Sequence, residues 1–374
     1  MVVLSGVTVL DLSTVGPAAR AARMLADYGA RVIKVGAPAA AGGVQIEPPF
    51  YAYGGHRGME RVRLDLKSDE GRAAFLRLAG EADVVIESFR PGVVDRLGIG
   101  YEAVKVVNPG VVYCATSGYG QDGPKAQWAG HDVNYLAAGG YFACAGRGAD
   151  GELTLPGATV ADIAAGGMQA VIAILAALVG RAGSGEGAYL DVSVADGVVG
   201  MLALLIDEHL ATGAVPEPGH DILTGRYACY GLYRCADGGW VSVGAIEPKF
   251  YANLCRLLGC EQWTGHQLDD AVQDQIRADF AAAFATRPRD EWVAELGPAD
   301  TCVAPVNGID EVVADAQVLA RGDVVEAVRP GGETFRQVAA VWAGAPRPDR
   351  VEVRDPGFDD SDRLLAAPAE EVPR

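Results

Sequence analysis

Residues 7–35 read VTVLDLSTVGPAARAARMLADYGARVIKV, and this stretch decides the fold. Its two ends, 7–13 and 30–35, are apolar runs of the kind that forms strands, and 17–29 between them has the pattern of a helix. Strand, helix and strand in this order predict two parallel strands joined by a crossover helix. Similar segments follow at 61–66, 69–81, 82–89, 92–107 and 110–119. The chain therefore begins with an α/β domain in which helices wrap a parallel sheet.

This large domain continues well beyond residue 119. A long apolar helix after Thr159, a strand at 187–194 and a helix at 195–213 extend the same alternation. Proline and glycine then gather in the stretch AVPEPGHDILTGR, which is typical of a linker. We place the large domain at 1–205 and the linker at 206–226.

A smaller domain follows the linker. The pattern CYGLYRCADGGWVSVGAI predicts a β-hairpin with ADGG at its turn, and the runs KFYANLCRLLG and AVQDQIRADFAAAFA after it are helical. We expect an α+β domain at 227–320. The remaining segment, 321–374, ends in a polar, proline-rich stretch and is expected to return to the large domain.

Composition excludes several partners. The formal net charge of −18 argues against nucleic acid and anionic membrane surfaces, since both need a basic footprint. Seven scattered cysteines without a CxxC pair suit a cytoplasmic protein, and the first residues lack the basic region of a signal peptide. The apolar stretch 158–180 is interrupted by Asp162 and Gln169, which favours a core helix over membrane insertion.

The sequence offers no cofactor motif. GxGxxG and the Walker lysine motif are both missing, so dinucleotide or nucleoside triphosphate chemistry is not expected. The five lysines have no setting typical of a pyridoxal Schiff base, and the five histidines show no metal-ligand spacing. We expect a reaction that uses no cofactor and no metal.

Three titratable residues have unusual placements, and each has two readings. His131, in AGHDVNY, is either a packed or solvated histidine or a proton carrier. Asp162 lies in the apolar opening of a long helix, where it either complements the helix dipole or acts as an acid/base group. Glu247 precedes Pro248, so a helix start explains it as well as a functional role does. None of the three identifies a site alone.

Taken together, the quoted segments resemble the α-methylacyl-CoA racemases within the wider group of family III CoA-transferases. The resemblance covers nearly the whole chain. It is carried, in the family's order, by GVTVLDLS, MLADYGARVIKV, LDLKSDEGR, GYGQDGP, AGHDVNYL, VADIAAGG, ADGGWVSVGAIEPKFYA and TCVAPV. It implies a large doubly wound domain, a smaller domain, and an interlocked homodimer whose active sites lie between the large domain of one chain and the small domain of the other.

The resemblance also implies roles for these residues. His131 and Asp162 would flank the α carbon of an acyl-CoA thioester as two acid/base groups, and Glu247 would orient the imidazole. If His131 opens a helix, the positive end of that helix favours a neutral imidazole, and backbone amides near Asp162 would bind the enolate oxygen. The family motif further implies substrate or CoA contacts from Gly130, Asp132, Asn134, Tyr135, Arg61 and Arg96.

The chain departs from the racemase pattern where CoA phosphates are bound. Ala37 stands where an arginine is usual, and HRGMER keeps Arg57 and Arg61 but replaces a basic pair with Met59 and Glu60. These changes make Arg96, in VVDRLGIG, the family-like phosphate partner that remains.

The function predicted from sequence is racemisation or epimerisation of 2-methyl-branched acyl-CoA thioesters through an enolate. Two alternatives stay open: a family III CoA-transferase that forms an aspartyl-CoA thioester on Asp162, and a non-catalytic acyl-CoA-binding protein. The acyl chain is not specified, because a branched fatty acid, a sterol side chain and an aryl propionate all present apolar surfaces.

Overall fold

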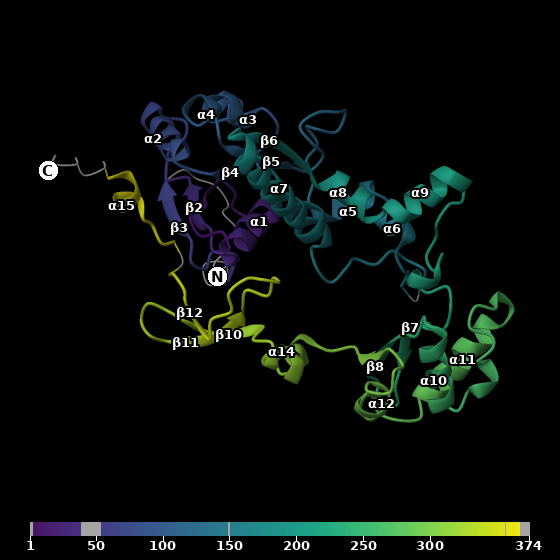
Figure 1. Ribbon diagram of the computed structural model, residues 1–374. Helices are drawn as coiled ribbons and strands as arrows, with labels where there is room; N and C mark the ends of the chain where they lie inside the picture. Colours follow the sequence, from purple (N-terminus) through teal and green to yellow (C-terminus); the bar gives the residue numbers. More distant parts are fainter. Residues whose placement is uncertain (1–2, 39–53, 149, 356, 367–374) are drawn as a thin grey trace. The chain divides into compact units, whose positions relative to one another are not determined.

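The computed structural model describes residues 3–38, 54–148, 150–355 and 357–366 of the chain (Figure 1). Its contacts divide the chain into two units. The large unit comprises Met1–Tyr141, Leu155–Ile206 and Ala316–Arg374, and the second unit comprises Phe142–Thr154 and Asp207–Asp315. The sequence placed 142–154 in the large domain, whereas the structure groups this excursion with the second unit. Within the second unit, for example, the Cys144 thiol donates to the carbonyl of Pro216 at 4.0 Å.

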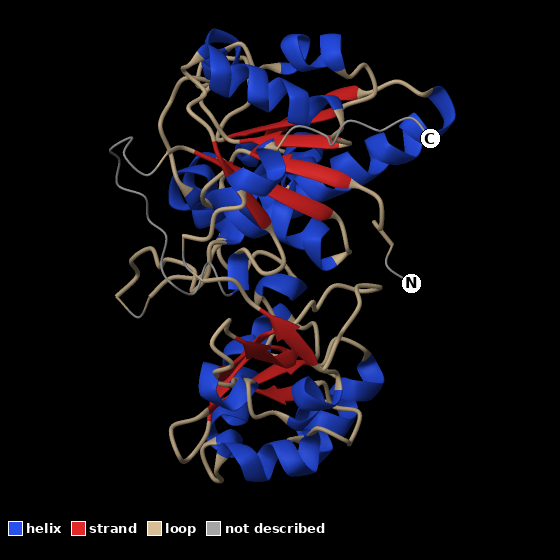
Figure 2. Cartoon of the chain, turned by 90° about the vertical axis from the view of Figure 1, so that its left-hand side faces the viewer, coloured by secondary structure: helices blue, strands red, loops and turns tan. Residues whose placement is uncertain are grey.

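The large unit is built on a six-stranded sheet whose neighbouring strands are all parallel. The strand order is β3-β2-β1-β4-β5-β6. Figure 2 shows these strands in red between helices. The strand bounds are β1 Thr8–Asp11, β2 Arg31–Gly36, β3 Glu60–Arg63, β4 Val84–Glu87, β5 Val112–Ser117 and β6 Ala188–Ser193. The order of the chain reverses between β1 and β4, and their carboxyl ends are where ligands bind in open parallel sheets.

Helices cover both faces of this sheet. Successive residues of a strand belong to different cores: Val9 packs with helices α1 (Gly16–Asp27) and α7 (Gln169–Ser184), and Leu10 packs with α2 (Asp69–Gly80). The second core also contains residues of two short helices, α3 (Val93–Leu97) and α4 (Tyr101–Val107). The apolar strand runs in the sequence follow from this burial on two faces.

The helices next to β5 and β6 pack unusually closely. A π-helical segment, η2 (Ala161–Met168), continues directly into α7. It meets α1 at Gly166 and α8 (Val194–Met201) at Gly197. A methyl group added at Gly166 would lie 2.5 Å from Cβ of Pro17, so only glycine permits this approach. The helix predicted at 195–213 is two helices, because α8 ends at Met201 and α9 (Ala203–Thr212) begins after Leu202.

The long helix from Ala161 to Ser184 meets the length and composition of a membrane span. Its most apolar window has a mean hydropathy of 2.1, and only 33% of that window is buried. Ala170, Val171 and Ile174 lie in the sheet core, while Ile172 and Val179 are exposed. The expected core helix therefore buries one face within its own chain and leaves an apolar face uncovered.

The second unit contains the predicted hairpin. Strands β7 (Tyr230–Arg234) and β8 (Trp240–Gly244) are antiparallel, and β9 (Val303–Pro305) pairs with β8. Three helices build its core with Tyr251, Phe280, Phe284 and Trp292. They are α10 (Pro248–Leu257), α11 (Gln273–Phe284) and α12 (Arg289–Leu296), with shorter helices α6 (Tyr141–Cys144), α13 (Ile309–Val312), η3 (Ile222–Thr224), η4 (Glu261–Trp263) and η5 (Asp270–Val272) elsewhere along the chain.

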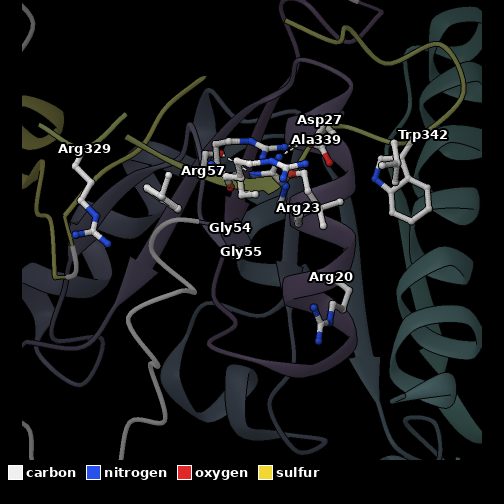
Figure 3. Close-up of a pocket in the computed structure, with 14 residues that line it drawn as sticks. Arg20, Arg23, Asp27, Gly54, Gly55, Arg57, Arg329, Ala339 and Trp342 are labelled. Atoms are coloured by element: carbon white, nitrogen blue, oxygen red, sulfur yellow. Dashed lines mark hydrogen bonds and ion pairs between the residues drawn. The ribbon is translucent and has the colours of Figure 1, made fainter. Parts of the chain in front are cut away.

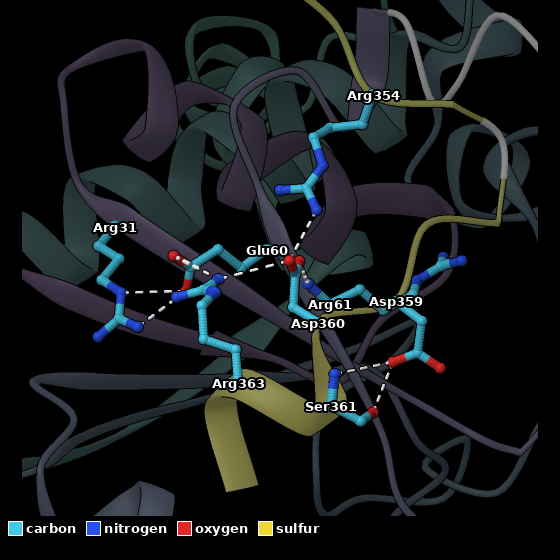
Figure 4. A network of polar contacts seen from close by, with 8 residues as sticks. All are labelled: Arg31, Glu60, Arg61, Arg354, Asp359, Asp360, Ser361 and Arg363. Atoms are coloured by element: carbon cyan, nitrogen blue, oxygen red, sulfur yellow. Dashed lines mark hydrogen bonds and ion pairs between the residues drawn. The ribbon is translucent and has the colours of Figure 1, made fainter. Parts of the chain in front are cut away.

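The C-terminal segment adds a small sheet to the large unit, which the sequence did not indicate. After α14 (Ala316–Ala320), strands β10 (Val324–Val328), β11 (Thr334–Val338) and β12 (Arg350–Glu352) form it in the order β11-β10-β12. Asp360, just before α15 (Ser361–Leu365), accepts from the Arg61 backbone N–H at 3.0 Å and donates its own N–H to the Arg61 carbonyl. Figure 4 shows this attachment to β3.

Candidate active site

His131 and Asp162 lie at the starts of two helices of the large unit. His131 is the residue before α5 (Asp132–Ala138), with extended backbone, and its N–H donates to Oδ1 of Asn134 at 3.0 Å. Its side chain is exposed. Asp162 is the second residue of η2 and is half-buried. π-Helical turns are rare and occur often at functional sites.

One hydrogen bond joins these two helix starts. The backbone N–H of Asp162 donates to Oδ1 of Asp132 at 2.8 Å. Asp132 follows His131 directly, so this bond fixes the loop that carries the imidazole against the turn that carries the carboxylate. The expectation that amides near Asp162 bind an enolate oxygen needs a correction, because the amide of Asp162 itself is already engaged.

The charges around Asp162 favour proton exchange. Burial raises the pKa of its carboxyl above the ordinary value, and the negative charge of Asp132 raises it further. The positive charges of Arg20 and His131 act in the opposite direction. A carboxyl with a raised pKa holds a proton at a higher pH than an ordinary aspartate does and can return it to a substrate.

Tyr135 holds the loop that carries His131 in place. Its hydroxyl donates to the carbonyl of Gly130 at 2.6 Å, and burial together with the charge of Asp162 raises its pKa to about 12. A methyl group at Gly130 would lie 2.7 Å from the ring, and one at Gly118 would be closer still. These two glycines therefore allow the buried ring to hold the loop.

A cavity of about 380 Å³ opens beside His131 at the carboxyl ends of β4 and β5. His131, Asn134 and Tyr135 form one wall. The other described lining residues are Ser88, Phe89, Arg90, Pro91, Ser117, Gly118, Ala126, Trp128, Ala129 and Gly130. The predicted residues Gly130, Asn134 and Tyr135 thus belong to one pocket with the imidazole, and Asp132 links that pocket to Asp162.

A second cavity, of about 780 Å³, lies at the carboxyl ends of β1 to β4. It shares Ser88 and Phe89 with the first cavity, and Ala37 forms part of its wall. Lys67 is the single cationic residue among its described lining residues. Sequence reasoning passed over Lys67, although LDLKSDEGR was among the blocks that carried the resemblance. The place of this cavity, at the reversal between β1 and β4, is typical of nucleotide sites.

The basic residues expected to bind CoA have different surroundings. Arg96, on α3, is exposed, and its neighbour Leu97 lines the larger cavity. Arg61 is 4% exposed, and its guanidinium lies 5.4 Å from the ring centroid of Phe358. Arg61 lines neither cavity, so its expected CoA contact is corrected to a contact that holds the C-terminal segment.

Met59 and Glu60, which stand in place of the family's basic pair, have structural roles of their own. Met59 is 1% exposed and belongs to the sheet core. Glu60 forms ion pairs with Arg31 at 2.8 Å and with Arg363 at 3.1 Å (Figure 4). Neither position faces a ligand cavity of the described chain, and the nearby Arg57 binds Asp27 at 3.1 Å.

Glu247 belongs to the second unit and is described with it alone. It is the exposed residue before α10, and no capping bond involves its side chain. Burial raises the pKa of the Cys302 thiol, and the charges of Glu247 and Asp300 add to this rise. Elsewhere, no group of three or more histidine, cysteine or acidic side chains that could hold a metal occurs in the described part of the chain.

Comparisons with known proteins agree with the resemblance. The family model "CoA-transferase family III" matches residues 4–361. The chain is 34% identical to human alpha-methylacyl-CoA racemase over 86% of this chain and 82% of the relative. It is 30% identical to the succinate–glutarate CoA-transferase of Agrobacterium fabrum over 99% and 96%. The crystal structure of a CAIB/BAIF family protein from Brucella suis has a TM-score of 0.80, 28% identity, and coverage of 96% and 98%. The chain therefore belongs to CoA-transferase family III and is an enzyme of this class of CoA-transferases and racemases.

Proposed function

We propose that this enzyme interconverts the 2R and 2S forms of 2-methyl-branched acyl-CoA thioesters. The observation that carries the proposal is the hydrogen bond between Asp132 and the Asp162 amide, which joins the helix start behind His131 to the one that carries Asp162. Racemisation needs two acid/base groups at one carbon, and a bond that joins the segments carrying His131 and Asp162 supports such a pair. The similarity to alpha-methylacyl-CoA racemase agrees with it.

The reaction is a 1,1-proton transfer. One group, in its basic form, removes the α proton, and the electron pair of the C–H bond moves to the thioester oxygen as an enolate. The other group, in its acidic form, then donates a proton to the opposite face of the carbon, and the carbonyl re-forms. A neutral imidazole suits the first role, and a carboxyl with a raised pKa, as at Asp162, suits the second. The roles exchange for the opposite enantiomer.

CoA is part of the substrate, and we propose that it occupies the larger cavity at the carboxyl ends of β1 to β4. Lys67 lines this cavity, and the exposed Arg96 precedes the lining residue Leu97, so these two cations are offered to the phosphates. The acyl end would then reach the smaller cavity past Phe89, which lines both. No cofactor or metal is needed for this chemistry, because both proton carriers are side chains.

We also propose an interlocked homodimer built on the doubly wound large domain. In it, the second unit of one protomer supplies Glu247 to the His131 and Asp162 site of its partner. The apolar face left uncovered on α7, with Ile172 and Val179, supports an interface, since contiguous exposed apolar surface is typical of protein contacts. The enzyme is expected in the cytoplasm, in the metabolism of branched-chain lipids.

A second candidate is CoA transfer. It is favoured by the similarity of the whole chain to succinate–glutarate CoA-transferase. In that reaction a carboxylate of Asp162 attacks the thioester carbonyl and the thiolate of CoA leaves. The resulting anhydride is then opened by the thiolate to give an aspartyl thioester, with release of the first acid. This route has no task for a proton carrier at His131.

Solvent deuterium separates the two candidates. Purified enzyme is incubated in deuterated water with a single enantiomer of a 2-methylacyl-CoA, with and without added free acids. Racemisation predicts deuterium at the α carbon and loss of stereochemical purity. Exchange of CoA onto the added acid, without α-labelling, would instead establish transfer and refute our proposal.

A further inference from the structure

A third cavity of about 770 Å³ lies in the large unit (Figure 3). Five of its described lining residues are arginines, and Asp27 is the single acidic one. The arginines are Arg20, Arg23, Arg57, Arg329 and Arg336. In a chain with a formal net charge of −18, this is a local reversal of charge.

This cavity lies at the opposite edge of the sheet from the proposed CoA site. Helix α1 begins after the carboxyl end of β1 and ends before the amino end of β2, so Arg23 and Asp27 in its second half approach the amino-terminal edge. Arg57 precedes β3 and reaches the same edge. The cavity shares no described lining residue with the two cavities beside His131. It is therefore a different cavity, although one of its lining residues, Arg20, also acts on the charge of Asp162.

Two buried guanidinium groups share one carboxylate oxygen here. Arg57 binds Oδ1 of Asp27 at 3.1 Å, and Arg23 binds the same oxygen. The side chains of Arg57 and Asp27 are only 9% and 6% exposed. Two cations against one anion leave a surplus positive charge in a place from which water is largely excluded, and such a charge is costly unless it is paired. Burial lowers the pKa of Arg23 to about 10, an effect that Asp27 opposes and the charge of Arg57 adds to.

Apolar side chains line the same cavity: Phe335, Val338, Val341 and Trp342. Two of these residues lie next to guanidiniums, because Arg57 donates to the carbonyl of Val338 at 2.7 Å and the Arg329 guanidinium lies 5.1 Å from the Phe335 ring centroid. An anionic group can thus face the guanidiniums while an organic portion contacts the apolar side chains beside them.

We infer that this cavity binds a small molecule that carries phosphate. The planar fork of arginine matches phosphate oxygens, and several guanidiniums around one cavity suit a group with more than one negative charge. The volume is in the range of pockets that enclose nucleotide-sized ligands. The inference does not depend on the racemase proposal, because it uses none of the acid/base residues.

The test measures binding of two probes, pyrophosphate and ADP, by calorimetry with the full-length enzyme, both alone and saturated with CoA. Saturation fills the proposed substrate site, and because CoA carries phosphate itself, the measurement without CoA shows whether CoA also occupies the second cavity. We compare Arg57→Gln, which removes a buried guanidinium, with Arg336→Gln, which removes an exposed one from the rim and leaves the core intact. Arg350→Gln is the control, since Arg350 is an exposed arginine of the same small sheet that does not line the cavity.

The expected result is about one equivalent of probe per chain, weakened about tenfold or more by Arg336→Gln and unchanged by Arg350→Gln. Trp342→Ala distinguishes the source of the phosphate. Weaker binding of ADP alone indicates an organic phosphate, and equal effects on both probes indicate an inorganic one; both support the site. No binding either with or without CoA, or equal binding by wild type and both cavity variants, would overturn the inference.

Discussion

The carboxyl of Asp162 has one acidic neighbour, Asp132, and two basic ones, Arg20 and His131, and together with burial they set its pKa. Burial and the charge of Asp132 raise its pKa, while Arg20 and His131 lower it. Asp132 has a second task, because its Oδ1 accepts the backbone N–H of Asp162. Asp132 therefore both positions the turn that carries Asp162 and raises the pKa of its carboxyl.

Replacing Asp132 with asparagine separates these two tasks. The Asp132→Asn side chain keeps an acceptor oxygen but loses the charge, so the pKa of Asp162 should fall. Exchange that uses Asp162 as a base should then persist to lower pH than in the wild type. The measurement is the pH dependence of deuterium exchange, with Asp122→Asn, an exposed aspartate outside the cavities, as control. If the exchange rate of Asp132→Asn fell at the same low pH as that of the wild type, the electrostatic role of Asp132 would be contradicted.

Glu87 predicts how stability depends on pH. It is 2% exposed at the end of β4, and burial raises its pKa to about 8, against the effect of a hydrogen bond from the Phe89 amide. The folded state thus holds a proton that the unfolded state loses above about pH 4.5. Its stabilising contribution is complete below that pH and is lost as pH rises through 8, by an amount on the order of a few kcal/mol.

Glu87→Gln should remove this dependence, because the amide resembles the protonated carboxyl. Urea unfolding at pH 5 and pH 8.5 measures it: the wild type should lose more stability than the variant between the two. Parallel losses in both proteins would show that Glu87 does not titrate in this range.

At the residue scale, the sequence indicated His131 and Asp162 as candidate proton carriers but not the pairing of the arginines. His131 and Asn134 stand three positions apart in one motif, whereas Asp162 is 30 positions from its partner Asp132 and was grouped with that motif only through the family resemblance. Arg57 was noted only as a retained basic residue of HRGMER; its partner Asp27 is 30 positions away, and no short pattern records such a pair. Met59 was interpreted as a lost cation, whereas its burial depends on strands and helices that only the folded chain brings together.

The element that positions Asp162 is η2, which packs closely between α1 and α8. At Gly197 an added methyl group would fall on the backbone carbonyl of Ala165, and at Gly166 on the ring of Pro17. Neither approach leaves room for a side chain on the glycine, so both fix η2 tightly. The position of the Asp162 carboxyl therefore depends on Gly166 within η2 and on Gly197 in α8.

Two glycines of α8 make a matched pair for testing this. Gly197→Ala should destabilise the protein by about 1–3 kcal/mol and lower the exchange rate, because η2 must shift. Gly200→Ala, in the same helix but with no atom within 4 Å of the added methyl, should leave activity unchanged and be neutral or slightly stabilising. Thermal unfolding and exchange rates measure both. Equal effects of the two substitutions would refute the close-packing argument.

At the element scale, the sequence predicted the parallel sheet well and its surroundings less well. Strands β1, β2, β4, β5 and β6 follow apolar runs, since burial on both faces leaves a clear pattern. The break at Leu202 and the π-helical turn leave none, because both arise from contacts with neighbouring helices. The small sheet β10 to β12 has alternating, partly exposed strands, which resemble loop sequence.

At the scale of the whole molecule, the proposed dimer would allow Glu247 of one protomer to reach the site in the large unit of its partner. Helix α9 buries none of its residues, and Leu204 and Leu210 on it are exposed. We expect light scattering to give twice the chain mass of 38.9 kDa. Leu210→Glu should weaken the assembly and lower exchange, whereas Val106→Glu, an equally exposed apolar residue on α4, should do neither. A fully active monomer would contradict the dimer.

A mixed dimer tests whether the site is shared. Co-expressed chains that carry His131→Ala and Glu247→Ala are purified as the heterodimer by two tags. If each site combines the large unit of one chain with the second unit of the other, one site contains both substitutions and the other contains neither. About half of the wild-type activity should return. If each site is built within one chain, both sites are defective and no activity returns.

The central claim is that His131 and Asp162 act on opposite faces of one carbon, and enantiomer-resolved exchange tests it most directly. Deuterium entry into pure 2R and pure 2S substrates is followed under single-turnover conditions for His131→Ala and Asp162→Asn. Each variant should lose about 10² to 10⁴ in racemisation, with abstraction suppressed from one enantiomer by the first and from the other by the second. Equal loss from both enantiomers in both variants would contradict the account and leave His131 as an orienting residue.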